Sequence, residues 1–165
     1  MNEATHAQKL AEAGAIRRYR QAKERKLQCA VIVYLNMNFP QEDLPHWAVN
    51  NNISGGGQSS VIQGKMAKDM GVLAGVFDLH FLYKGIFRVI ELKVPGGTIS
   101  KSQREYEKNI IKHGGECYYC YSAREVHEVL KSWGLNPKYE PAIVNERSKK
   151  LMTQMAVMKE LYRRD

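Results

Sequence analysis

Hydrophobic positions along this chain switch between the spacing of helices and the spacing of strands. Helices are predicted over residues 3–37, 60–71, 100–114, 122–133 and 144–162, and Gly14 is a potential break in the first of them. Strands are predicted over residues 46–51, over a hairpin at 75–94 and over residues 116–121. This order predicts one α/β domain, a mixed β-sheet flanked by helices, with helical arms at both ends.

The predicted hairpin, "GVFDLHFLYKGIFRVIELKV", is mostly apolar but contains three charged residues at one end. If Lys84-Gly85 is a two-residue turn, strand pairing is symmetric about it and Asp78 lies directly opposite Glu91. Lys93 then points to the same face as Glu91, because side chains alternate along a strand. A three-residue turn would shift the register, so that alternative stays open. The opposite face would be a core face made of Phe77, Leu79, Phe81, Ile90, Leu92 and Val94.

Two carboxylates directly opposite each other repel, unless a cation lies between them or one of them stays protonated. A divalent ion bound by oxygen ligands would be Mg²⁺ or Mn²⁺ rather than zinc. On charge alone, the alternative is a salt-bridged group on an exposed sheet face.

The composition of the chain agrees with a polyanionic partner. The 165 residues carry a formal net charge of +8, and the sequence pI is about 9.4. Such a basic chain suggests nucleic acid first and an anionic membrane second, with a solvated basic surface as the alternative. The longest wholly apolar run, Cys29–Leu35, is too short to span a bilayer, and the N-terminus has no signal-peptide core. A cytoplasmic protein is therefore expected.

Cysteine usage predicts neither a disulfide framework nor a zinc site. The chain has three cysteines, and Cys117 and Cys120 have CxxC spacing within a predicted strand. Positions three apart in a strand face opposite sides, and no second pair of ligands has zinc-finger spacing.

Asp78, followed after twelve residues by Glu91-Leu92-Lys93, matches the D-Xn-E-x-K core of the PD-(D/E)XK nucleases. Around it, the chain resembles the VRR-NUC family, the virus-type branch of these nucleases, over roughly residues 24–133. The matching features are two glycines before the aspartate, the P-G-G loop after the lysine, and an S-x-x-Q helix start. Phe77 departs from the family, which usually has proline there; proline is not a metal ligand.

The resemblance implies a restriction-endonuclease-like fold over residues 24–134, with a helical arm at 1–23 and a linker and helix at 135–165. It implies that Asp78 and Glu91 bind the metal, together with Glu24, which matches an acidic residue of the family. Lys93 would orient or deprotonate the attacking water and offset phosphate charge, and Gln103 would support the site.

Two of these residues have independent interpretations. Glu24 shares one helix face with Gln28, Val31 and Leu35, which turns it toward the core. The alternative is a solvated acid at the helix surface. Gln103 could instead serve only the capping box with Ser100. His80, two residues after Asp78, is expected to be a packing histidine rather than a site residue.

These observations predict a Mg²⁺- or Mn²⁺-dependent nuclease that hydrolyses DNA, most consistent with a structure-selective endonuclease of a bacterial or phage-infected cell. Basic residues flank the predicted site and would contact phosphates, or else are ordinary solvated surface: Lys65, Lys68, Lys101 and Arg104. A homodimer would suit cutting of two strands. The alternatives are a non-catalytic nucleic-acid-binding or docking module that keeps the fold, and an anionic-membrane binder. Neither helical arm has the aromatic and basic faces that membrane binding requires.

Overall fold

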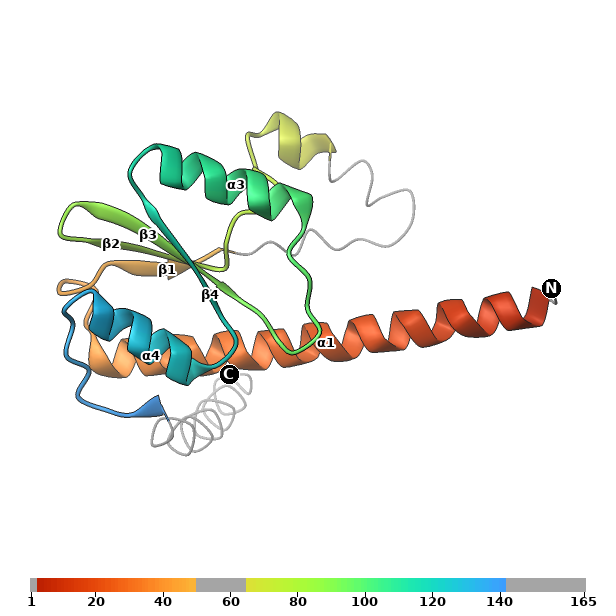
Figure 1. Ribbon diagram of the computed structural model, residues 1–165, viewed down its shortest axis with the longest axis horizontal. Helices are drawn as coiled ribbons and strands as arrows, with labels where there is room; N and C mark the ends of the chain where they lie inside the picture. Colours follow the sequence, from red (N-terminus) through yellow and green to blue (C-terminus); the bar gives the residue numbers. More distant parts are fainter. Residues whose placement is uncertain (1–2, 50–64, 142–165) are drawn as a thin grey trace, which may run out of the picture. The chain divides into compact units, whose positions relative to one another are not determined.

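The computed structural model describes residues 3–49 and 65–141 (Figure 1). Its elements in chain order are α1 (Glu3–Asn38), β1 (His46–Ala48), β2 (Leu79–Tyr83), β3 (Ile86–Leu92), α3 (Lys101–Lys112), β4 (Glu116–Cys120) and α4 (Ala123–Ser132). Residues 65–69 are also helical, in agreement with the helix predicted before Gly71. The predicted helix at 144–162 and the first residues of the predicted helix at 60–71 lie outside the described residues.

The chain divides into two compact units. The helical unit contains the described residues up to Phe39, Lys93–Gly97 and the described residues from Tyr121 onward. The sheet unit contains the described residues of Pro40–Leu92 and the whole of Thr98–Cys120. The predicted division at residues 23 and 134 stays a prediction.

The sheet unit contains a four-stranded sheet in the order β1-β2-β3-β4. The β1–β2 and β2–β3 pairs are antiparallel, and the β3–β4 pair is parallel. A parallel pair needs a crossover connection, and α3 supplies it and packs along the sheet (Figure 1). The prediction of an α/β protein with a mixed sheet is therefore confirmed.

The β2–β3 hairpin has the predicted register. Leu79 pairs with Ile90 and Tyr83 with Ile86, so only Lys84 and Gly85 lie between the strands. Both turn residues have positive φ, 51° for Lys84 and 76° for Gly85, as a type I′ turn requires. The two-residue turn is favoured despite the unusual lysine, because its twist matches that of the strands.

Both faces of the hairpin are largely buried. On the predicted core face, Leu79, Phe81 and Ile90 are each at most 1% exposed. Phe77 is also fully buried but lies on the other face, since its ring contacts Tyr106 of α3 and Tyr119 of β4. The alternation of side chains between the two faces does not extend to Phe77, because regular strand pairing starts only at Leu79.

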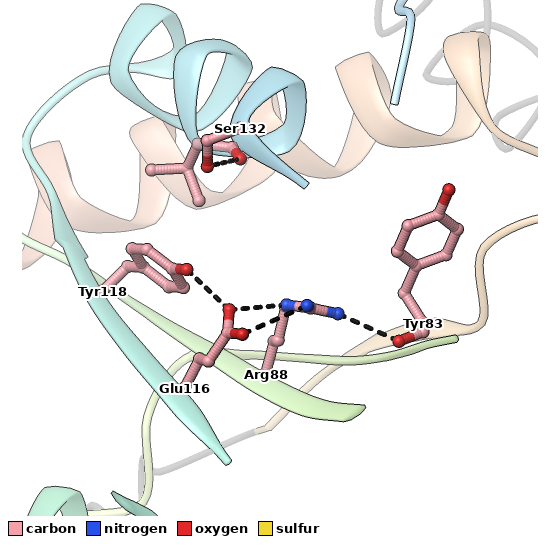
Figure 2. A network of polar contacts seen from close by, with 6 residues as sticks. Tyr83, Arg88, Glu116, Tyr118 and Ser132 are labelled. Carbon is pink, nitrogen blue, oxygen red and sulfur yellow. Dashed lines mark hydrogen bonds and ion pairs between the residues drawn. The ribbon is translucent and has the colours of Figure 1, made fainter. Parts of the chain in front are cut away.

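A charged network lies on the face that the sequence pattern assigns to the core (Figure 2). The Arg88 guanidinium donates to both carboxylate oxygens of Glu116, over 2.7 and 3.2 Å, and to the Tyr83 carbonyl over 2.9 Å. The Tyr118 hydroxyl donates to the same carboxylate over 2.6 Å. These hydrogen bonds from Arg88 and Tyr118 hold the pKa of Glu116 below its ordinary value. Arg88 can be buried beside β4 because its donors are satisfied.

In the helical unit, α1 runs unbroken through Gly14, so the potential break there is wrong; glycine weakens a helix without necessarily ending it. The buried Tyr34 hydroxyl lies 2.8 Å from His127 Nδ1 and joins α1 to α4. Asn38 donates to the Tyr139 carbonyl and accepts from the Tyr139 N–H. Within residues 3–49 and 65–141, no helix is long and apolar enough to cross a membrane.

Replacement of Arg88 by methionine should lower the free energy of unfolding by about 2 kcal/mol at pH 7, since the half-exposed Glu116 loses a forked partner. Because the folded pKa of Glu116 is depressed, its contribution is present above the unfolded pKa and disappears as pH falls through the folded pKa. Urea denaturation of wild type and Arg88→Met should therefore give a smaller difference at pH 3 than at pH 7. An equal difference at both pH values would contradict this role.

Candidate functional site

The sheet unit brings Asp78 and Glu91 to the same end of the hairpin. Asp78 directly precedes Leu79, whose partner Ile90 directly precedes Glu91, so the two acidic residues lie at the same end of the hairpin. Its carboxylate Oδ2 accepts a hydrogen bond from the Leu92 N–H over 2.9 Å, and its carbonyl accepts one from Val49. A carboxylate has about four lone-pair positions, so one such bond orients Asp78 without exhausting its capacity to bind a cation.

Glu91 is only 3% exposed and is oriented by Gln103. The Gln103 amide nitrogen donates to Glu91 Oε1, in a short contact. The amide oxygen of the same side chain accepts from the Ser100 N–H over 2.9 Å, while Ser100 Oγ accepts from the Gln103 N–H. The capping box and the support of Glu91 were predicted as alternatives; Gln103 performs both, because the box consumes its oxygen and leaves its NH₂ group to donate.

Gly75 fixes the loop that leads into Asp78 against the start of α3. A Cβ atom at Gly75 would lie 2.4 Å from the Ser102 carbonyl carbon and 2.5 Å from the Gln103 nitrogen. Its φ of +78° also favours glycine. The first turn of α3 therefore contacts both the loop before Asp78 and the side chain of Glu91.

The helical unit contains the other two predicted site residues, Lys93 and Glu24. Val94–Gly97 is a type II turn, in which the Gly97 N–H donates to the Val94 carbonyl and Gly96 has a φ of +80°. A Cβ at Gly97 would lie 3.4 Å from Lys93 Cδ and 3.6 Å from Glu24 Oε1. Glu24 is half-buried on the same side of α1 as the buried Val31, as its helix face predicts, so it is not a fully solvated acid.

The structure divides four of the predicted site residues between the two units. Asp78 and Glu91 belong to the sheet unit, whereas Glu24 lies beside Lys93 in the helical unit. Among the residues that the structure describes, no three His, Cys, Asp or Glu side chains form a group that could hold a metal ion. The predicted basic contacts are all exposed, and Lys101 forms a salt bridge with Glu105: Lys65, Lys68, Lys101 and Arg104.

His80 is a packing residue, as predicted. Its ring contacts Trp47, Phe87 and Tyr106, and its Nε2 lies 3.3 Å from the Tyr106 hydroxyl. Burial lowers the pKa of His80, so the imidazole is neutral at pH 7. It therefore carries no charge that would oppose a bound cation.

The cysteines of the CxxC stretch lie on opposite faces of β4, since Cys117 pairs with Val89 and Cys120 with Leu92. Burial and the nearby Glu107 raise the pKa of Cys117 to about 11. The thiol is therefore protonated at pH 7, unlike a reactive or metal-binding thiolate.

Comparisons with protein-family models, curated proteins and solved structures find no match for this chain.

Alanine at Gly75 should lower the free energy of unfolding by about 3 kcal/mol, from left-handed strain and overlap with α3. Gly71 is a matched control: its φ is +82°, but a Cβ there would meet no atom within 4 Å. Gly71→Ala should cost only the strain, about 1 kcal/mol. If chemical denaturation gives the same loss in free energy of unfolding for Gly75→Ala and Gly71→Ala, the close contact of Gly75 with α3 does not contribute to stability.

Gln103→Ala should destabilise the protein by about 2 kcal/mol, because the buried Glu91 loses a donor in addition to the lost cap. Ser100→Ala removes the other half of the capping box without touching Glu91, and should cost about 1 kcal/mol. The comparison is made by urea denaturation at pH 7. If the two variants lose the same stability, the Gln103–Glu91 hydrogen bond contributes nothing beyond the capping box.

Proposed function

We propose that this protein is a Mg²⁺- or Mn²⁺-dependent nuclease that hydrolyses phosphodiester bonds of DNA. Its fold would be restriction-endonuclease-like, of the VRR-NUC type that the sequence resembles, and a structure-selective endonuclease fits the sequence best. One observation carries the proposal: Gln103 of α3 donates to the buried carboxylate of Glu91, at the end of the hairpin that also carries Asp78. Such a buried carboxylate, oriented by an amide at a fixed position, is typical of a metal ligand with a supporting residue.

The donor chemistry of this pair fits a hard divalent cation. Both side chains offer only carboxylate oxygens, and two ionised carboxylates at one end of the hairpin repel each other unless a cation lies between them. Asp78 and Glu91 would hold the ion, with Glu24 as a further acidic ligand in the proposal. When bound, the ion would polarise the phosphate and lower the pKa of a water molecule.

The protein groups have separate tasks in this proposal. The Leu92 N–H fixes one oxygen of Asp78, and Gln103 fixes one oxygen of Glu91, so both carboxylates are oriented before an ion binds. Lys93, two residues after Glu91, would orient or deprotonate the attacking water and offset the charge that develops on the phosphate. His80 is a neutral packing residue, and no role in the chemical step is proposed for it.

The test is to incubate purified protein with plasmid, single-stranded, flap and four-way DNA in Mg²⁺, Mn²⁺ or EDTA. Wild type should cut at least one substrate with either metal and none in EDTA. Asp78→Asn and Lys93→Met should each lower the rate by about a hundredfold or more, since each removes a group aimed at transition-state charge. Asp43→Asn, the same change at an exposed aspartate, should leave the rate unchanged.

Two results would contradict the proposal. If wild type cuts no substrate with either metal but binds DNA, the protein is a non-catalytic module that keeps the sheet and its carboxylates. If cutting survives in Asp78→Asn at the wild-type rate, the activity comes from another site or from a contaminant.

A further inference from the structure

Arg20 lies at the same turn as Glu24 and Lys93 in the helical unit. A Cβ atom at Gly96 would lie 3.1 Å from Arg20 Nη2, just as one at Gly97 would lie 3.6 Å from Glu24 Oε1. Arg20 and Glu24 are four residues apart in α1, so their side chains leave the same side of the helix. The Val94–Gly97 turn is therefore contacted by a basic and an acidic side chain from successive turns of α1.

The Arg20 guanidinium is available to a ligand. Arg20 is exposed and forms no ion pair with any residue of 3–49 or 65–141, and it lies over a glycine that offers no side chain. The φ of +80° at Gly96 favours glycine, and a second glycine follows it. Because these two residues have no side chains, Arg20, Glu24 and the Lys93 stem all lie close to the backbone of the turn.

The charges at this turn favour binding of an anion by Arg20 rather than beside Glu24. Glu24 would repel a phosphate, whereas the planar guanidinium of Arg20 can donate two parallel hydrogen bonds to one. The backbone of Arg20 lies about 6 Å from that of Glu24, toward the N-terminus of α1, because four residues of a helix rise by that distance. A phosphate held by Arg20 can therefore lie one helical turn away from the Glu24 carboxylate.

We propose that Arg20 binds a backbone phosphate of a nucleic-acid strand, next to the phosphate that Lys93 serves. The identification of the Arg20 ligand as a phosphate of the nuclease substrate rests on the proposed nuclease function. Arg20 is a substrate-binding residue in this proposal and takes no part in the chemical step. Arg25, five residues after Arg20, points to another side of α1 and would not share this task.

The test separates binding from cleavage. Fluorescence anisotropy of a labelled flap DNA in EDTA gives the affinity at several salt concentrations for wild type, Arg20→Gln, Arg20→Lys and Arg25→Gln. Arg20→Gln should bind about tenfold more weakly, with the slope of log affinity against log salt reduced by about one. Arg20→Lys should fall between it and wild type, because lysine keeps the charge but loses the fork. Arg25→Gln removes the same charge from an exposed position on the opposite side of α1 and should weaken binding less than twofold.

Cleavage of the same DNA in Mg²⁺ gives the second readout. Arg20→Gln should raise KM about tenfold and leave kcat within twofold of wild type, as expected for loss of a binding contact outside the chemical step. The inference is overturned if Arg20→Gln and Arg25→Gln bind alike, if wild type does not bind DNA, or if kcat falls while KM stays unchanged. If wild type binds but does not cut, the nuclease proposal fails, while the EDTA comparison still supports or overturns the phosphate contact of Arg20.

Discussion

The hydrogen bond from Gln103 to Glu91 is the interaction on which the sheet unit of this protein depends. It joins a carboxylate in the centre of the sheet to the first turn of α3, whose capping box fixes the donor. Gly75 contacts the same turn of the helix, and the loop after it leads to Asp78. Without the Gln103 donor, the buried Glu91 would carry a larger desolvation cost, so the same hydrogen bond contributes to stability and orients the Glu91 carboxylate.

The charged residues of this hydrophobic hairpin are compatible with burial because each has specific partners. Asp78 accepts from the Leu92 N–H, Glu91 accepts from Gln103, and Arg88 donates to Glu116. Arg88 and Glu116 form an ion pair in which the two opposite charges balance each other. Asp78 and Glu91 instead bring like charges to one end of the hairpin, and this contrast separates a structural ion pair from an arrangement suited to a cation.

The sequence was sufficient to predict interactions that depend on local spacing. The Lys84-Gly85 turn determines the register of β2 and β3, and helical periodicity places Glu24 on the half-buried side of α1. Interactions that depend on distant segments could not be predicted. Arg88 finds Glu116 only because β4 pairs in parallel beside β3, and Phe77 joins Tyr119 because regular pairing begins after it. Gln103 both completes the capping box and donates to Glu91. The second contact depends on where α3 lies on the sheet, and the spacing of residues along the chain does not predict that position.

The central claim is that Asp78 and Glu91 together bind a divalent ion. Crystals grown with Mn²⁺ and measured at a wavelength where manganese scatters anomalously would locate that ion directly. The account predicts an anomalous peak within about 2–2.5 Å of a carboxylate oxygen from each residue, and no such peak in crystals of Asp78→Asn. Manganese bound elsewhere, or no peak at this pair in Mn²⁺-saturated wild-type crystals, would contradict it.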